Sequence, residues 1–251
     1  MKNISSKQAS ERLIFALDAQ SYDDALSLVE LLSGHVGMFK VGKELFTAAG
    51  PEIIRCIKEK SQKVFLDLKF HDIPNTVARA AEAAVKMNVD MFNVHASGGS
   101  RMIQEAVSAA WNCADKLGQT RPVLLAVTVL TSLNNEDLKE IGFQKSTSEL
   151  VRHLAGLTKA AGASGVVASA QDIRMLRENF GDDFVIVTPG IRSAAEAKKD
   201  DQKRTLSAYE AVAAGADYIV VGRPIRMAPN PLDACRLIVQ EIAEGLSARS
   251  F

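Results

Sequence analysis

Charged side chains interrupt an apolar stretch, VFLDLKFHDIPNT, at residues 64–76. Asp67, Lys69 and Asp72 lie within six positions of one another in a segment that otherwise has the composition of a buried strand. Side chains alternate between the two faces of a strand, so Asp67 and Lys69 are expected on one face and the leucines on the other. Burying such charges is costly unless they compensate one another. The pattern predicts a confined site in which ammonium and carboxylate groups keep each other ionised.

A second ammonium group comes from another apolar run, GMFKVG, which contains Lys40. If this run forms the neighbouring strand, Lys40 joins Asp67, Lys69 and Asp72 in an alternating Lys–Asp–Lys–Asp array. The array has two interpretations: a catalytic site built on fixed charges, or a structural ion network. Asp18 ends the first apolar run of the chain and is a further candidate for the same site.

The elements that must position these residues repeat along the chain. Short apolar runs recur at intervals of about 20 to 35 residues, and each is followed by a longer amphipathic segment. Apolar residues three or four apart predict helices at 148–162, which ends in a glycine, and at 231–246, where Asn230 precedes Pro231 as a cap. The eight runs predicted as strands are 13–18, 37–42, 64–69, 89–96, 122–130, 164–169, 184–190 and 217–222.

Strand followed by helix, eight times over, predicts parallel strands with helical crossovers. A (β/α)8 barrel, that is, a TIM barrel, has this number of units and this length. An open doubly wound sheet is the alternative, but the first strand ends in LDAQSYDDA, at residues 17–25, without a glycine-rich turn. We therefore expect a single α/β barrel domain over residues 13–251, preceded by a polar extension over residues 1–12.

In a barrel of this kind, active-site residues come from the carboxyl ends of the strands. The loops after strands seven and eight often bind phosphate through backbone amides and a cation. Here these loops carry TPGIR, at residues 188–192, and the pair Gly222–Arg223. A phosphate site is one interpretation of the pair, and an Arg223 bound to a surface carboxylate is the other. The charged stretch 192–205, after the seventh strand, is a candidate mobile loop.

Composition limits the possible functions. The 251 residues include 30 basic and 30 acidic side chains, so no overall field favours nucleic acid or an anionic membrane as a partner. Three scattered cysteines and a polar N-terminus without an apolar signal core indicate a cytoplasmic protein with reduced thiols. His71 and His95 are near the array, but their spacing does not match a metal site. We predict no metal.

With the array and the phosphate loops in view, the sequence resembles the orotidine 5′-phosphate decarboxylases in their bacterial form. The resemblance extends over nearly the whole chain except the N-terminal dozen residues, and the stretch 65–76 is its most specific part. The motifs that carry it are MFKVGKELF at 38–46, FLDLKFHDIPNT at 65–76, NVHASGG at 93–99, AVTVLTS at 126–132, TPGIR at 188–192 and YIVVGRP at 218–224.

The resemblance implies decarboxylation of orotidine 5′-monophosphate to UMP, the last step of de novo pyrimidine synthesis, without a metal or organic cofactor. It implies that Lys69 donates the proton to C6 and that Asp67 lies beside the departing carboxylate. Lys40 and Asp18 would bind the ribose hydroxyls and hold the array together.

The same resemblance implies a homodimer in which Asp72 and Thr76 reach into the partner's site. It assigns Thr131 to the pyrimidine. It assigns the phosphate to Arg192, Gln202, Gly222 and Arg223, with Gln202 in a loop whose length varies in the family.

Two other functions remain as alternatives. A metal-dependent hexulose-phosphate synthase or keto-gulonate-phosphate decarboxylase of the same suprafamily also uses a strand of the DxKxxD type, but needs an acidic magnesium ligand near the end of strand two. Lys40 lies in that region, with Glu44 nearby. A non-catalytic barrel that binds a nucleotide phosphate would retain Arg223 but would not need the array.

Overall fold

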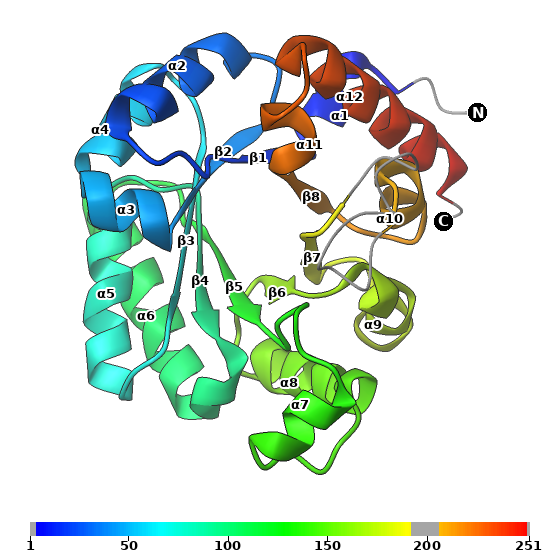
Figure 1. Cartoon of the computed structure of the whole chain (residues 1–251). Coiled ribbons are helices and arrows are strands. Elements are labelled where there is room, and N and C mark those ends of the chain that lie inside the picture. Colours follow the sequence, from blue (N-terminus) through cyan, green and yellow to red (C-terminus); the bar gives the residue numbers. More distant parts are fainter. Residues whose placement is uncertain (1–3, 192–205, 250–251) are drawn as a thin grey trace.

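Eight parallel strands close into a barrel in the chain order β1 to β8 (Figure 1). The computed structural model describes residues 4–191 and 206–249. Pairing of β1 with β8 closes the barrel, which confirms the predicted architecture and excludes the open sheet. A strand forms in each of the eight predicted runs, and β3 extends one residue beyond its run. The strands are β1 Leu13–Ala16, β2 Met38–Gly42, β3 Val64–Phe70, β4 Met91–His95, β5 Val123–Val127, β6 Gly165–Val167, β7 Val185–Thr188 and β8 Tyr218–Val221.

Helices surround the barrel and cover the outer faces of its strands (Figure 1). Two short 3-10 helices, η1 Ala96–Gly98 and η2 Ala170–Asp172, follow β4 and β6. The α-helices are α1 Ser6–Ser10, α2 Tyr22–Leu32, α3 Lys43–Ala49, α4 Glu52–Glu59, α5 Pro74–Lys86, α6 Gly99–Leu117, α7 Asn135–Glu140, α8 Thr147–Ala160, α9 Ile173–Phe180, α10 Ala208–Ala213, α11 Arg223–Arg226 and α12 Pro231–Ala248.

The two helices predicted from periodicity form close to their expected limits. In α12, the side chain of Asn230 accepts hydrogen bonds from the backbone N–H groups of Leu232 and Asp233, so it caps the helix as predicted. In α8, the last turn is followed by Gly162 with a φ of 83°, a left-handed conformation that glycine adopts without strain.

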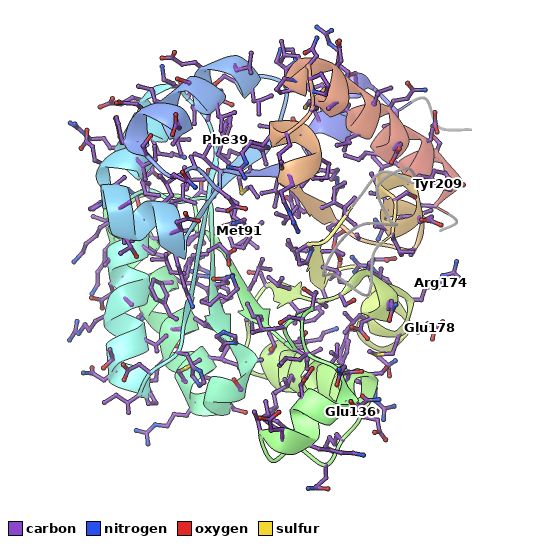
Figure 2. All side chains as sticks on the ribbon, in the orientation of Figure 1. Phe39, Met91, Glu136, Arg174, Glu178 and Tyr209 are labelled. Carbon is purple, nitrogen blue, oxygen red and sulfur yellow. The ribbon has the colours of Figure 1, made fainter. Side chains whose placement is uncertain are left out.

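Alternate residues of the strands fill the inside of the barrel, and the residues between them pack against the helices. Figure 2 labels one residue of each kind: Met91 belongs to the interior cluster, whereas Phe39 belongs to the larger core under the helices. Ile14, Ala16, Met38, Phe65, Met91, Leu125, Val187 and Val220 form the interior cluster. The interior cluster fills the barrel below the carboxyl ends of the strands. Polar and charged side chains inside the barrel are therefore confined to the layer above it.

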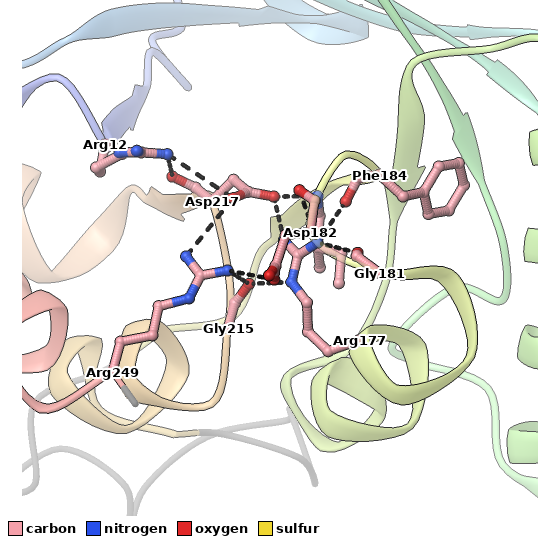
Figure 3. A network of polar contacts seen from close by, with 9 residues as sticks. Arg12, Arg177, Gly181, Asp182, Phe184, Gly215, Asp217 and Arg249 are labelled. Atoms are coloured by element: carbon pink, nitrogen blue, oxygen red, sulfur yellow. Dashed lines mark hydrogen bonds and ion pairs between the residues drawn. The ribbon is translucent and has the colours of Figure 1, made fainter. Parts of the chain in front are cut away.

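The opposite end of the barrel is held by an ion network centred on Asp217 (Figure 3). Asp217 immediately precedes β8, and it pairs with Arg12, Arg177 and Arg249. Arg12 precedes β1 and Arg249 follows α12, so the network joins both ends of the described chain to the barrel. The N-terminal stretch also contributes α1, which packs on α12 and buries Ala9 (Figure 1).

Within the described ranges, no helix has the length and apolar character that crossing a bilayer requires.

Candidate active site

Three charged side chains meet above the interior cluster, toward the carboxyl ends of β2 and β3. Lys69 Nζ donates to Asp67 Oδ1 at 2.6 Å, and Lys40 Nζ lies 3.4 Å from Asp67 Oδ2. Asp67 therefore has an ammonium group at each carboxylate oxygen. The strand alternation explains the convergence, because these residues follow Met38 and Phe65 of the interior cluster at two-residue steps along their strands.

Asp18 extends this cluster toward solvent. Lys40 Nζ donates to Asp18 Oδ1 at 3.2 Å, and the Asp18 side chain is 52% exposed whereas that of Lys40 is 11% exposed. Lys40 thus lies between two carboxylates. Its positive charge neutralises them in part and would repel a metal cation there. Asp18, Lys40, Asp67 and Lys69 are brought together as predicted, and we call these four residues the charged cluster.

The charged cluster keeps the carboxyl group of Asp67 ionised. Burial by itself raises the pKa of a carboxyl group, and Asp67 is only 13% exposed. The charges of Lys40 and Lys69, together with hydrogen bonds from Lys69 and Asn93, outweigh burial and lower the pKa of Asp67 below its ordinary value. Two fixed positive charges and one largely buried negative charge therefore face the space above the barrel.

That space is a pocket of about 190 Å³. One wall is charged and carries Lys40, Asp67 and Lys69, and the rest is largely apolar. Thr131, predicted to contact a pyrimidine, also lines the pocket. The other lining residues are Phe65, Val127, Val129, Leu130, Val167, Ala168, Pro189 and Val220. An apolar pocket with charge on one wall suits a planar ring that carries a reacting anionic group.

A larger hollow, of about 480 Å³, lies on the outside of the barrel between α1 and α12. Lys7, His35, Cys235 and Arg236 are among its lining residues. It is far from the carboxyl ends of the strands and contains no carboxylate, so its size does not make it the better candidate for the reaction. The smaller pocket holds the charged cluster and lies where barrel enzymes have their active sites.

The backbone of Lys69 has a φ of 53°, which a residue with a side chain rarely adopts. The pairing of β3 with β4 shifts register between Leu66 and Phe70, and Lys69 lies within this irregularity. Its N–H donates to Asn93 Oδ1 at 2.8 Å, while Asn93 Nδ2 donates to Asp67 Oδ1 at 2.7 Å. A left-handed conformation at a residue other than glycine costs about 1–3 kcal/mol of conformational free energy. It persists only where the surrounding structure constrains the backbone.

Two histidines lie beside the charged cluster. The rings of His71 and His95 have centroids 5.5 Å apart. Burial, followed by the nearby charges of His71, Lys43 and Lys69, lowers the pKa of His95 to about 4. His95 is therefore neutral near pH 7. Within the described part of the chain, no three side chains of histidine, cysteine, aspartate or glutamate gather as they would to hold a metal ion.

The sequence predicts Asp72 as the fourth member of a Lys–Asp–Lys–Asp array. In the structure, Asp72 does not join the charged cluster of its own chain. Its carboxylate accepts a hydrogen bond from the N–H of Ile73 at 2.6 Å, and its side chain is exposed. Thr76, in the first turn of α5, is exposed as well. Ile73 between them is an exposed large apolar residue, with 66% of its surface accessible.

Gly222 and Arg223 are at the start of α11, next to the charged cluster. A Cβ atom on Gly222 would lie 3.1 Å from the Cβ atom of Ala16 and 3.5 Å from Asp18 Oδ2, so glycine permits a close approach there. Arg223 is exposed. The other two residues predicted to bind phosphate, Arg192 and Gln202, lie outside the described residues, as does the candidate mobile loop 192–205.

Two residues of this region were not predicted as site residues. Asn93 is buried and bonded to two members of the predicted array; the sign in the sequence was a polar residue inside the apolar run VDMFNVHA. Arg226 donates from Nη1 to the backbone oxygen of Asp18 at 2.7 Å and joins α11 to the end of β1. No spacing in the sequence pointed to that contact, because 208 positions separate its partners.

Comparison with known proteins decides among barrels that share this geometry. The sequence profile of the orotidine 5′-phosphate decarboxylase / HUMPS family matches residues 11–238. The chain belongs to this family.

Curated members of the family are similar over their full length. An orotidine 5′-phosphate decarboxylase of Syntrophus aciditrophicus is 56% identical over 249 residues, which is 99% of this chain and 99% of that protein. Another, from Geotalea daltonii, is 50% identical over 95% of this chain and 98% of that protein. The crystal structure of orotidine 5′-phosphate decarboxylase from Lactobacillus acidophilus is 39% identical, with a TM-score of 0.82, and covers 92% of this chain and 98% of that one.

The family profile by itself spans decarboxylases and the metal-dependent relatives that were the alternative. The full-length relatives described above all bear the decarboxylase name, which favours that function within the family.

Proposed function

We propose that this protein converts orotidine 5′-monophosphate to UMP and CO2, the last step of de novo pyrimidine synthesis, without a metal or organic cofactor. The observation that carries the proposal is the Lys69 ammonium bound to Asp67 on the charged wall of an otherwise apolar pocket. Membership of the family and relatives up to 56% identical support the same reaction.

The reaction itself explains why such a site is needed. Breaking the bond between C6 and its carboxyl carbon releases CO2 and leaves an electron pair on C6. No carbonyl group is placed to delocalise that pair. A fixed positive charge near C6 lowers the energy of the developing carbanion, and a proton delivered to C6 completes the product. The Lys69 ammonium serves both purposes and transfers one proton to C6.

The other members of the charged cluster prepare Lys69 for this task. Asp67 holds the ammonium by a 2.6 Å hydrogen bond and places a negative charge beside the substrate carboxylate. That charge raises the energy of the bound substrate relative to the transition state, in which the carboxylate is lost as neutral CO2. Lys40 and Asp18 bind the ribose hydroxyls, and Lys40 also keeps Asp67 ionised.

Substrate recognition uses the remaining predicted residues. Thr131, on the pocket wall, contacts the pyrimidine. Arg192, Gln202, Gly222 and Arg223 bind the phosphate. Because the phosphate is remote from C6, binding energy gained there is available for orienting the ring and closing the site.

The proposal includes a homodimer in which Asp72 and Thr76 complete the site of the partner chain. It is supported by the exposure of both residues and by the position of Asp72 outside its own charged cluster. Neither nucleic acid nor a membrane is a partner in this proposal, and the location is the cytoplasm.

The test is turnover of orotidine 5′-monophosphate by the purified protein in excess EDTA, followed by the loss of substrate absorbance and by the appearance of UMP. We expect full activity with EDTA and a loss of at least about 1000-fold in kcat/KM for Lys69→Ala. Lys116→Ala removes an exposed lysine from the end of α6 and is the matched control, with activity unchanged.

No turnover by the wild-type protein would reject the proposal. Activity that disappears with EDTA and returns with magnesium would instead support the metal-dependent relatives. Binding of UMP without turnover would support a barrel that only binds a nucleotide.

A further inference from the structure

Asn93 contacts two of the three residues of the charged wall, Asp67 and Lys69. It lies on β4, and its side chain has no exposed surface. It occupies the inward position that follows Met91 of the interior cluster, beside Asp67 on β3. Its amide makes two hydrogen bonds, one to the side chain of Asp67 and one to the backbone of Lys69.

These bonds form a closed ring of contacts. Asn93 Oδ1 accepts from the Lys69 N–H at 2.8 Å, Asn93 Nδ2 donates to Asp67 Oδ1 at 2.7 Å, and the same oxygen accepts from Lys69 Nζ at 2.6 Å. The ring therefore fixes the backbone of Lys69, the carboxylate of Asp67 and the ammonium between them. Each of the three residues restricts the positions of the other two.

The ring requires an amide at position 93. One end of the side chain must accept a hydrogen bond from an N–H, and the other end must donate one to a carboxylate. A primary amide has both an accepting oxygen and a donating NH2 group. Aspartate would accept from Lys69 but would place a second negative charge against Asp67. Leucine has the same branched arrangement of four side-chain heavy atoms but offers neither bond, and both Lys69 N–H and Asp67 would lose a partner in a buried place.

The left-handed backbone of Lys69 depends on the same contact. With a φ of 53°, Lys69 lies at the register shift between β3 and β4, and its N–H is bound by the Asn93 side chain. Releasing that N–H removes a restraint that holds an unfavourable conformation. The Cα–Cβ bond of Lys69 would then change direction, and a long side chain magnifies such a change at Nζ.

We propose that Asn93 is a positioning residue for the reaction: its amide holds the backbone of Lys69 and the carboxylate of Asp67 so that the ammonium faces the reacting carbon. The inference rests on the proposed function, because it takes Lys69 as the proton donor. It adds a residue that touches no substrate and acts through its two neighbours.

The variants Asn93→Leu, Asn93→Asp and Asn93→Ser test this role through turnover and its pH profile. A displacement of about 1 Å at a reacting group can cost about 100-fold in rate, so we expect kcat to fall by about that factor in Asn93→Leu and by more in Asn93→Asp. KM should stay within about 3-fold, because the residues that bind the substrate are unchanged. Thr158→Val removes a buried hydrogen bond in α8, far from the pocket, and should leave kcat unchanged.

The pH profile separates positioning from a general loss of stability. The groups that face Asp67 are Lys40 on β2, Lys69 on β3 and Asn93 on β4, with His95 further along β4. Since the Asn93 hydrogen bond helps to lower the pKa of Asp67, its removal raises that pKa. The acidic limb of kcat/KM should therefore move to higher pH in all three variants. A merely structural residue would change the midpoint of thermal unfolding without moving this limb.

The inference is overturned if folded Asn93→Leu retains wild-type kcat and the wild-type acidic limb. Hydrogen exchange of the Lys69 amide in the wild-type protein gives a second measurement, needed if the variants do not fold. Strong protection supports the contact with Asn93, and exchange at the rate of an open loop contradicts it. A wild-type protein that exchanges slowly but does not convert orotidine 5′-monophosphate would refute the proposed function and leave the contact itself established.

Discussion

Lys69 combines an unfavourable backbone conformation with the proposed role of proton donor, which would tolerate little displacement. Its left-handed φ costs free energy, which the hydrogen bonds to Asn93 and Asp67 offset. Asp67 has an ammonium group on each side and is ionised although only 13% of its side chain is exposed. The placement of these two residues thus comes at some cost to local stability, as is common in active sites.

His95 gives a prediction for the dependence of stability on pH. Its pKa is about 4 in the folded chain because of burial and the charges of His71, Lys43 and Lys69, compared with about 6.5 when unfolded. Between these values the unfolded chain binds more protons, so the free energy of unfolding falls as pH drops from about 6.5 toward 4. His95→Gln, which stays neutral, should lose less stability over that interval.

Urea unfolding at several pH values between about 7 and 5 measures this difference. Because His95 is partly exposed, the difference should be only a fraction of the ~1.4 kcal/mol per pH unit of a fully buried group. His153→Gln, at an exposed position in α8, is the control and should follow the wild-type curve. Parallel curves for His95→Gln and the wild type would contradict the lowered pKa.

Strand β6 is the shortest of the barrel, and its pairing with β7 depends on a glycine. A Cβ atom on Gly165 would lie 2.0 Å from the backbone oxygen of Val185, which no real contact permits. Gly165→Ala must therefore separate the two strands, and we expect a loss of about 1–3 kcal/mol or more in the free energy of unfolding. Because β6 also places Val167 in the pocket wall, the apparent KM should rise as well.

A second glycine-to-alanine substitution is the matched control. Gly156 lies inside α8, and a Cβ atom there would be 3.9 Å from the ring of Phe180, an ordinary contact. Gly156→Ala should therefore stabilise the protein by about 0.5–1 kcal/mol, since alanine loses less freedom than glycine in a helix. Denaturant unfolding measures both variants. Equal changes in the free energy of unfolding at the two positions would show that the β6–β7 pairing tolerates a side chain at position 165.

In the proposed function, the chemistry takes place at the carboxyl end of the barrel, and the ion network of Asp217 stabilises the amino end. Asp217, at the amino end, is 14% exposed and pairs with three arginines (Figure 3). Asp217→Ala leaves Arg12, Arg177 and Arg249 without their common carboxylate, and losing one partner of a buried pair costs about 3–5 kcal/mol. We expect that loss in unfolding experiments, with kcat/KM unchanged at temperatures where the variant is folded.

An exposed ion pair provides the comparison. Asp115 and Arg121 form a salt bridge at 2.7 Å in which both side chains are about half exposed. Asp115→Ala should cost less than about 1 kcal/mol, because solvent already screens the pair. If Asp217→Ala were as mild as Asp115→Ala, the network would not stabilise the barrel; if it abolished turnover in the folded state, the two ends would be coupled.

The proposed dimer predicts recovery of activity on mixing two inactive variants. Lys69→Ala removes the proposed proton donor, and Asp72→Ala removes the residue proposed to reach the partner's site. In their mixed dimer, one site has an intact Lys69 and receives an intact Asp72 from the other chain. Activity per mixed dimer should approach half of the wild-type value, measured after subunit exchange has been verified.

The control mixes Lys69→Ala with Asp67→Ala. Both substitutions affect residues of the same chain's charged cluster, so neither site of the mixed dimer is complete and no activity should return. Absence of recovery with Lys69→Ala and Asp72→Ala, despite verified exchange, would place Asp72 in its own chain's site.

The sequence by itself determined the barrel and the four residues of the charged cluster. Eight apolar runs with helical segments between them admit few other topologies, and the two-residue repeat of a strand sets Asp67 and Lys69 on one face. Because the carboxyl ends of all eight strands lie at one end of such a barrel, Asp18 and Lys40 were expected beside them, and they are.

Only the tertiary structure decided which further groups complete this cluster. The ring through Asn93 joins residues 26 positions apart, and Arg226 reaches the backbone of Asp18 across 208 positions. The left-handed backbone at Lys69 lies within the register shift between β3 and β4, and Asp72, outside its own cluster, follows the end of β3. Local periodicity carries no information about such contacts, because they depend on how closely strands approach once the barrel has closed.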